Sequence, residues 1–409
     1  MRLMLLALAR GGGGSFPARS TTFELAADGA HTWPNDPKHV YYNGKTYLTW
    51  ATADTGALKI AAYDHATETL GSPFTLHTYG ANIHNGAAVC VRASDHRLVV
   101  VYTSQDTSEI YVRISTNPED VSAWGAETNI DSSLGGEGYT YPVLYQLTSE
   151  ANQPLYLFFN DIVTSGANYH GYIGVSVSSD GGATWGTRGL LFQPEINENA
   201  YYRINSNGTD RIDVLVTDTS RTVGNPSALY HLYWQAAKWH KSDGTDLTGT
   251  GPWGAADCTL VKSASEGGRG ANPGFVSYDG AGSPVFLAQM WGLATLKLRY
   301  YRLVAGSWIE TVVDDDITAP GNYTAAMDRT LAGSVWAAKQ YGSVNEVVRY
   351  DTSDGGATWS DPLRLTIGSA ASNDLVESVQ NGVSGLRIVA CRGTYTSGSV
   401  FDYALWGMV

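Results

Sequence analysis

The sequence contains little cysteine, little charge and no long apolar segment. Its three cysteines, Cys90, Cys258 and Cys391, are widely spaced and odd in number, which argues against a disulfide framework and against a Cys-x-x-Cys metal site. We therefore expect the cysteines to be small apolar side chains in the core, and we predict no cofactor and no bound metal. No apolar run is long enough to predict a transmembrane helix.

Charged residues make up only 16% of the chain, and the net charge is −13. This excess of negative charge argues against nucleic-acid binding, and it would repel a polyanion unless basic side chains gather at one site. No long helical period is visible. Glycine (46), tyrosine (25) and tryptophan (12) are plentiful instead. Such a composition is typical of many short strands with tight turns and of the aromatic-rich surfaces of carbohydrate-handling proteins.

Residues 1–20 differ from the rest of the chain. A short apolar run over residues 3–9 is followed at once by Arg10 and by the glycine-rich segment 11–15. The run is shorter than the core of a signal peptide and lacks its polar cleavage region. We predict an apolar anchor and a flexible linker, suited to attachment to a larger assembly such as a virion, with a cleaved leader as the alternative. The protein is therefore expected to be extracellular or virion-associated.

A repeated eight-residue segment predicts the fold. Ser178–Trp185 (SSDGGATW) recurs almost unchanged as Thr352–Trp359 (TSDGGATW), each time between two apolar, strand-like runs. In a hairpin turn of this sequence, the hydroxyl and the Asp hydrogen-bond to turn amides, the glycines supply positive φ, and the Trp covers the turn. Each copy is therefore predicted to join two neighbouring strands. The segment matches the Asp-box pattern and resembles the repeats of bacterial neuraminidases, which implies that it lies on a β-propeller blade.

Weaker relatives of this turn end at Trp124, Trp239 and Trp308. Together with the two clear copies they recur about every 50 to 70 residues, which suits one four-stranded blade per repeat. At about 55 residues per blade, residues 21–409 predict a single all-β domain, a propeller with seven blades of four-stranded antiparallel sheet; six or eight blades are the alternatives. An Asn43-Gly44 hairpin is predicted within residues 33–50. The C-terminal segment 401–406 is predicted to complete a blade shared with the N-terminus.

Two strand entrances carry candidate chemistry. In residues 76–89 a polar loop leads into an apolar strand, and His84 at its mouth can act as a general base or acid; a loop-capping His is the alternative. In Gly138–Pro142, Tyr139 and Tyr141 can stack on a sugar or move a proton; packing in the core is the alternative.

The serial order of motifs resembles that of the BNR-repeat (Asp-box) propeller lyases, the ulvan lyases and their glucuronate-directed relatives. The resemblance covers about residues 30 to 360. The motifs that carry it are the hairpin of residues 33–50, His84-Asn85, Thr140–Pro142, Ser178–Trp185, Tyr201–Gly208, Tyr230–Trp234 and Ser242–Thr245.

The resemblance implies β-elimination from a uronic-acid-containing polysaccharide. In that reaction an Arg neutralises the uronate carboxylate, one His or Tyr removes the C5 proton and another protonates the leaving oxygen. His84 matches the family's acid/base position, with Tyr141 beside it as a catalytic candidate. Residues 198–200 occupy the place where relatives carry an Arg, so Arg203 is the nearest replacement; an ion pair at a blade edge is its alternative. The predicted substrate contacts are Asn85, Tyr139, His170, Tyr172, Tyr201, His231 and Arg269, with an interior histidine as the alternative for His231.

Two other functions compete with the lyase. A non-catalytic, glycan-binding propeller of a phage particle would explain the missing Arg, the acidic charge and residues 1–20. A depolymerase carried on a virion would reconcile that function with a retained His84. A sialidase-like hydrolase needs three arginines and a Tyr/Glu pair, announced by an Arg-Ile-Pro-like segment near the first strand, and no such segment precedes Arg92.

Overall fold

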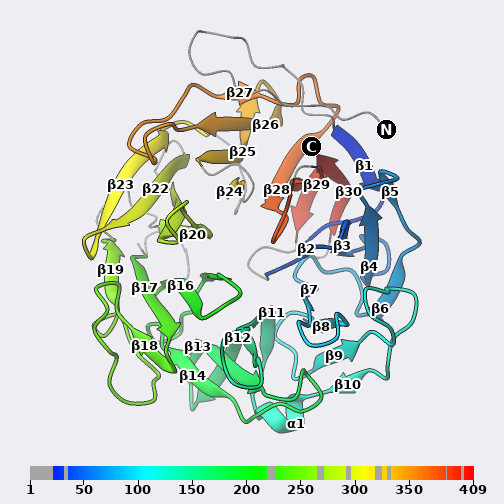
Figure 1. Cartoon of the computed structure of the whole chain (residues 1–409). Helices are drawn as coiled ribbons and strands as arrows, with labels where there is room; N and C mark the ends of the chain where they lie inside the picture. The colour runs from blue at the N-terminus through cyan, green and yellow to red at the C-terminus, as the bar shows by residue number, and fades with distance from the viewer. Residues whose placement is uncertain are drawn as a thin grey trace.

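The computed structural model describes residues 22–31, 36–218, 227–264, 271–291, 296–317, 325–328, 333–383, 385–397 and 400–409. Within these ranges the regular structure is strand, apart from one short helix, α1 (Asp131–Leu134). The strands form seven antiparallel sheets in a ring around a common centre (Figure 1). The predicted anchor of residues 1–20, together with Trp33, lies outside the described residues.

Each sheet is one blade, and in blades 1 to 6 its strands follow one another in the chain. Blade 1 contains β2 (His39–Tyr42), β3 (Lys45–Ala51), β4 (Ala57–Asp64), β5 (Thr69–Leu70) and β6 (Phe74–Thr78), and blade 2 contains β7 (Gly86–Val91), β8 (Leu98–Thr103), β9 (Ile110–Ile114) and β10 (Thr128–Asn129). Blade 3 contains β11 (Tyr139–Gln146), β12 (Leu155–Ser165), β13 (Asn168–Ser178) and β14 (Gly189–Phe192), and blade 4 contains β15 (Tyr202–Ser206), β16 (Arg211–Thr217), β17 (Leu229–Gln235), β18 (Lys238–His240) and β19 (Thr259–Lys262).

The remaining blades repeat this arrangement. Blade 5 contains β20 (Ala271–Tyr278), β21 (Pro284–Trp291), β22 (Leu296–Val304) and β23 (Ser307–Asp314), and blade 6 contains β24 (Ala325–Met327), β25 (Ser334–Tyr341), β26 (Val344–Asp351) and β27 (Leu363–Arg364). Blade 7 contains β28 (Ser372–Ser378), β29 (Ile388–Ser397), β30 (Val400–Met408) and β1 (Thr22–Ala26). The predicted seven-bladed propeller is confirmed.

Blade 7 closes the ring with both ends of the described chain. Strand β1 pairs antiparallel with β30, so that Glu24 lies opposite Trp406 (Figure 1). This confirms the prediction that the C-terminal segment completes a blade shared with the N-terminus. This pairing closes the ring, so that every blade packs between two neighbours and no blade stands at an open end.

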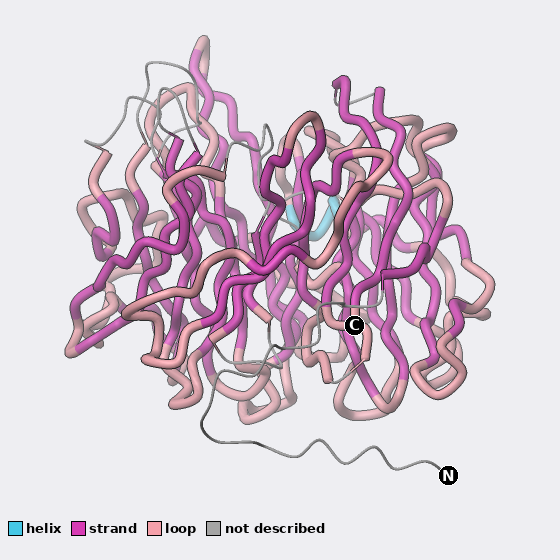
Figure 2. Tube along the Cα trace, turned by 90° about the horizontal axis from the view of Figure 1, so that it is seen from above, coloured by secondary structure: helices cyan, strands magenta, loops and turns pink. Residues whose placement is uncertain are grey.

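The core lies between neighbouring blades, because successive strand side chains point to opposite faces of a sheet. Val99 and Val101 of blade 2, for example, share one buried cluster with Leu157 and Phe159 of blade 3. The first strand of blade 3, β11, is buried along its whole length. Such first strands form a rigid frame around the centre, and polar residues at their ends are held in fixed positions. Figure 2 shows the blades from the side, with strands running between the two ends of the ring.

The repeated turn has the predicted hydrogen bonds. Ser178 Oγ donates to Asp180 Oδ1 at 2.8 Å and accepts the Gly182 N–H at 2.8 Å, while Asp180 Oδ1 accepts the Thr184 N–H at 2.9 Å. Trp185 is buried in the cluster between blades 2 and 3. The second copy makes the same contacts through Thr352, Asp354, Gly356 and Thr358. Both copies join two neighbouring strands, as predicted, and these are the third and fourth strands of blades 3 and 6.

The five turn tryptophans belong to blades 2 to 6, one in each. Each lies either in the turn between the third and fourth strands or in the fourth strand itself. In an antiparallel blade, the first-to-second and third-to-fourth turns lie at one end of the strands. We name this the tryptophan end, after turns such as Ser178–Trp185. The second-to-third connections and the connections between blades lie at the other end, which we name the loop end, after segments such as 79–85. Both predicted strand entrances are at the loop end.

Candidate functional site

His84 lies in the connection that leads into β7, the first strand of blade 2. Its backbone N–H and its ring Nδ1 both donate to Asn82 Oδ1, at 2.9 and 2.8 Å. Because an amide oxygen only accepts, Nδ1 carries the proton and the lone pair of the neutral ring is on Nε2. Burial lowers the pKa of His84 below its usual value, and the nearby Asp106 acts in the opposite direction. The neutral ring can therefore accept a proton at Nε2 near neutral pH.

Asn85, predicted as a substrate contact, instead holds the loop that carries His84. Its side chain is buried. Its Nδ2 donates to the Gly80 carbonyl at 2.8 Å, and its Oδ1 accepts a hydrogen bond from Ser104 Oγ at 2.8 Å. These contacts tie the loop to the end of β8. Asn85 therefore positions His84, and this burial argues against contact with substrate.

Tyr141 lies at a bulge in β11, the first strand of blade 3. Its φ is +58°, a left-handed conformation that is strained for a bulky residue and that marks functional positions when the surrounding structure enforces it. Here the Tyr202 hydroxyl donates to the Tyr141 carbonyl at 2.7 Å. The ring centroid of Tyr141 lies 5.9 Å from that of His84. Two neighbouring blades thus bring together two side chains that the sequence predicts as catalytic.

Asp106 connects the two strand entrances, although sequence reasoning did not single it out. Thr140 Oγ1 donates to Asp106 Oδ1 at 2.9 Å, and the Asp106 N–H donates to Thr140 Oγ1 at 2.8 Å. This contact fixes β11 against blade 2 next to His84. Asn82 was also missed, although an Asn two residues before the residue whose N–H it binds is a recognisable turn pattern. No local pattern points to Asp106.

Arg203, on β15 of blade 4, is 1% exposed and lies in a charged network at the centre of the ring. Its Nη1 contacts Asp36 Oδ2 at 2.9 Å and Glu377 Oε2 at 3.2 Å, and Lys38 Nζ contacts Glu377 Oε2 at 2.8 Å. Burial alone would raise the pKa of Glu377, but Lys38 and Arg203 lower it to about 2. Two cations and two carboxylates therefore compensate each other, which favours the structural ion pair over a substrate contact for Arg203.

Tyr139 and His231 are also held inside blades. Tyr139 is fully buried; its hydroxyl donates to Asp131 Oδ1 at 2.8 Å and accepts the Gly136 N–H at 2.6 Å. His231 is fully buried as well, with Nδ1 2.7 Å from Ser242 Oγ and Nε2 2.9 Å from Asp213 Oδ1. The Ser–His–Asp order is that of a hydrolytic triad, but burial closes it to a substrate. These positions favour structural roles for both predicted contacts.

Three other predicted contacts reach the surface at the loop end. His170 and Tyr172, on β13, are half-buried, and their ring centroids lie 5.4 Å apart. Tyr201, which is half-buried, begins the approach to β15. A Cβ on Gly171 would lie 1.9 Å from Asn199 Oδ1, so the glycine lets residues 198–200 dock against β13. Arg269 lies outside the described residues.

The described ranges also bear on metal binding and on membrane spans. No group of three or more His, Cys, Asp or Glu side chains there could hold a metal ion. In the same ranges no helix is long and apolar enough to cross a membrane. The three cysteines are free thiols; Cys258 and Cys391 are buried and Cys90 is half-buried.

No protein-family model and no curated protein matches the chain. Solved structures do. A PL25 ulvan lyase has a TM-score of 0.72 and 14% identity, over 94% of this chain and 95% of that one. A PL25 ulvan lyase bound to -[GlcA(1-4)Rha3S]- has a TM-score of 0.72 and 14% identity, over 95% of each chain. Polysaccharide lyase Uly1 has a TM-score of 0.60 and 12% identity, over 94% and 97%. At these identities the likeness shows the fold, and membership of the BNR-repeat family stays a prediction.

Proposed function

We propose that the protein is a polysaccharide lyase that cleaves a uronic-acid-containing polysaccharide by β-elimination at the loop end of the propeller. The observation that carries this proposal is the His84–Tyr141 pair, which joins a neutral imidazole and a phenol across two blades. The fold similarity to ulvan lyases supports the choice of substrate class.

The pair supplies both proton transfers that the reaction needs. His84 Nε2 takes the proton from C5 of the uronate, and the C–H electrons form the C4–C5 double bond. The C4–O bond breaks, and its electrons go to the leaving oxygen, which takes a proton from the Tyr141 hydroxyl. Each transfer by a positioned group contributes about 10²- to 10⁴-fold in rate. The products are an unsaturated uronate and a shortened chain, and no water is consumed.

The uronate carboxylate also needs a cation, because the C5 proton is only weakly acidic while the neighbouring charge is uncompensated. Two arginines were predicted for contacts with an anionic sugar. Arg203 is already compensated by Asp36 and Glu377. Arg269, the other predicted arginine, is therefore the remaining candidate for the carboxylate in this proposal.

The compensated charge of Arg203 also favours a second candidate function, a propeller that binds a glycan without cutting it. In that case the loop end would retain the shape of a lyase site and lack the cation that activates the substrate. Binding without product formation would distinguish it from the lyase.

Incubation of the purified protein with ulvan and with other uronate-containing polysaccharides tests the proposal. The ultraviolet absorbance of the unsaturated uronate is expected to rise with the parent and not with His84→Ala. His96→Ala is the matched control, because His96 is an exposed residue at the tryptophan end of the same blade. Binding of a polysaccharide with no rise in absorbance would replace the lyase by the binding function. A rise with His84→Ala equal to that of the parent would contradict the assigned base.

A further inference from the structure

A cavity of about 350 Å³ lies at the tryptophan end, between blades 5 and 6. Its wall in blade 5 includes the first-to-second-strand turn with Asp279 and the end of β22 with Tyr300 and Arg302. Its wall in blade 6 includes the repeated turn with Trp359. These turns belong to the opposite end of the ring from His84, so the cavity is separate from the proposed active site. Its volume falls in the range of about 300 to 1,000 Å³ that is usual for small-molecule sites.

Two aromatic rings give the cavity an apolar wall. The rings of Tyr300 and Trp359 meet edge to face, with centroids 5.1 Å apart. Trp359 is half-buried. The Trp therefore combines a packing role in the turn with a surface that remains available to a ligand. Aromatic rings of this kind contribute a large, rigid contact area against the C–H face of a sugar ring.

Arg302 and Asp279 give the same cavity a donor and an acceptor. Within the described ranges, Arg302 forms no ion pair with a carboxylate, and its buried Nε has no hydrogen-bond partner. Asp279 is exposed, and only its Oδ1 receives the turn amides of Ala281 and Ser283, both at 2.9 Å. A buried hydrogen-bond donor without a partner lowers the stability of the protein. The Arg302 guanidinium therefore favours a ligand that supplies a hydrogen-bond acceptor.

We propose that this cavity is a second saccharide-binding site, which holds sugar units of the glycan away from the loop end. Sugar hydroxyls both donate and accept, so neighbouring hydroxyls can accept from Arg302 and donate to Asp279 while the ring lies against Trp359. The identity of the glycan rests on the proposed function. Two binding points on one protein raise its avidity for a long polymer through effective concentration, without any change in the chemistry.

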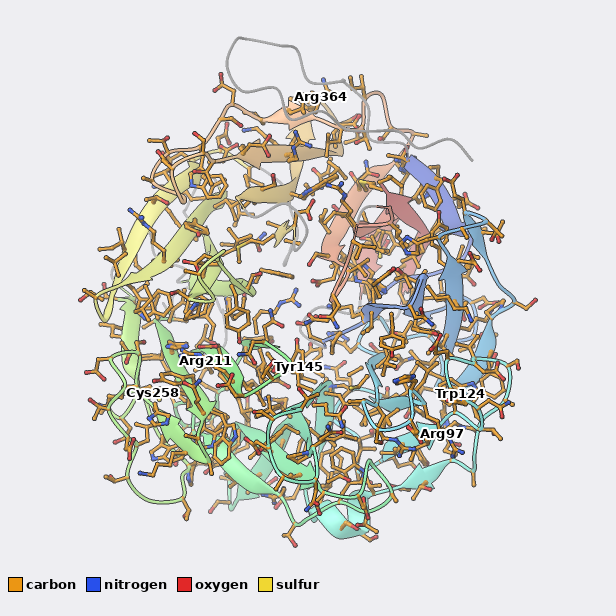
Figure 3. All side chains as sticks on the ribbon, in the orientation of Figure 1. Arg97, Trp124, Tyr145, Arg211, Cys258 and Arg364 are labelled. Atoms are coloured by element: carbon orange, nitrogen blue, oxygen red, sulfur yellow. The ribbon has the colours of Figure 1, made fainter. Side chains whose placement is uncertain are left out.

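Electrophoresis through gels that contain increasing amounts of ulvan, or of the other uronate-containing polysaccharides, tests this site. The full-length His84→Ala protein is used, so that the polymer is not cut. Arg302→Gln and Asp279→Asn are then added separately; the Asn keeps the oxygen that the turn amides need. Arg97→Gln is the matched control, because Arg97 occupies the first-to-second-strand turn of blade 2 (Figure 3).

Each cavity variant is expected to raise the apparent dissociation constant about tenfold, as for the loss of one hydrogen bond to a charged group, and Arg97→Gln is expected to leave it unchanged. Melting temperatures equal to that of the parent would show that the fold is intact. Retardation of both cavity variants equal to that of the control would overturn the inference, as would the absence of retardation with every polymer.

The two proposals can fail independently. Retardation that depends on Arg302, with no unsaturated product from the parent, would leave the second site standing and remove the lyase. Product formation together with retardation that does not depend on Arg302 would support the lyase and remove the second site.

Discussion

The ring centroids of His84 and Tyr141 lie 5.9 Å apart, across the junction of blades 2 and 3. Neighbouring backbone and side chains hold each residue in place. Asn82 holds the backbone and Nδ1 of His84, and the bulge in β11 directs Tyr141 away from the regular pleat. A base in the loop before one first strand and an acid on the next suit an elimination, because proton removal and proton donation must occur at two atoms of the same substrate.

Tyr141→Phe is expected to lower kcat about 100-fold or more and to change KM little, because the ring still packs while the proton donor is lost. Initial rates of formation of unsaturated uronate over a range of polymer concentrations would measure both parameters. A kcat within about twofold of the parent value would remove Tyr141 from the mechanism.

Asn82→Asp is expected to shift the acid limb of the pH–rate profile to higher pH. In the parent, burial lowers the pKa of His84, so the base remains neutral, and the rate is retained, below the ordinary histidine pKa of about 6.5. A carboxylate in place of the amide keeps the acceptor for Nδ1–H and favours the protonated ring, which raises its pKa. At a pH near 6 the variant therefore has less neutral His84 and a lower rate. Superimposable profiles would contradict His84 as the base.

Arg203→Gln is expected to lower the free energy of unfolding by about 3 to 5 kcal/mol, because it removes one of the two cations, Arg203 and Lys38, that contact the buried carboxylates of Asp36 and Glu377. Denaturant unfolding of the purified variant measures this loss. Arg349→Gln is a suitable control, since that arginine pairs with the half-buried Asp351 at the end of β26. Unchanged stability together with a loss of activity would restore Arg203 to the role of carboxylate neutraliser.

Arg269→Gln is expected to give the opposite result, a lower kcat/KM with an unchanged melting temperature. Removal of one electrostatic stabiliser typically costs about 10²- to 10³-fold. Arg269→Lys retains the charge and should recover part of the rate. Full activity in both variants would mean that another cation neutralises the uronate.

Local patterns in the sequence were sufficient for the fold. The SSDGGATW turn encodes its own hydrogen bonds, so its two copies and their weaker relatives predicted the blades and their number. His84 was also predictable, because it stands at the mouth of an apolar strand. The central network was not, because Asp36, Arg203 and Glu377 come from three blades that only the closed ring brings together.

Tyr139 and Tyr141 show the limit of strand periodicity. The sequence predicted both tyrosines at the site because they stand at one strand entrance. Residues two apart in a regular strand also point to the same face. The register shift between Thr140 and Val143 and the positive φ of Tyr141 break this alternation. Both tyrosines are buried, but Tyr139 is fully enclosed in the cluster between blades 2 and 3, while Tyr141 is 8% exposed and its ring lies beside His84. A bulge of this kind has no clear signal in the sequence.

The origin of the oxygen atoms in the cleaved product tests the central claim most directly. The polysaccharide is digested in water enriched in oxygen-18, and the masses of the product oligosaccharides are measured by mass spectrometry. Elimination consumes no water, so we predict product ends with one unsaturated uronate and no heavy oxygen beyond the slow exchange at the reducing end, which an uncleaved oligosaccharide in the same water measures. Incorporation of one oxygen-18 atom per cleavage would identify a hydrolase and contradict the account.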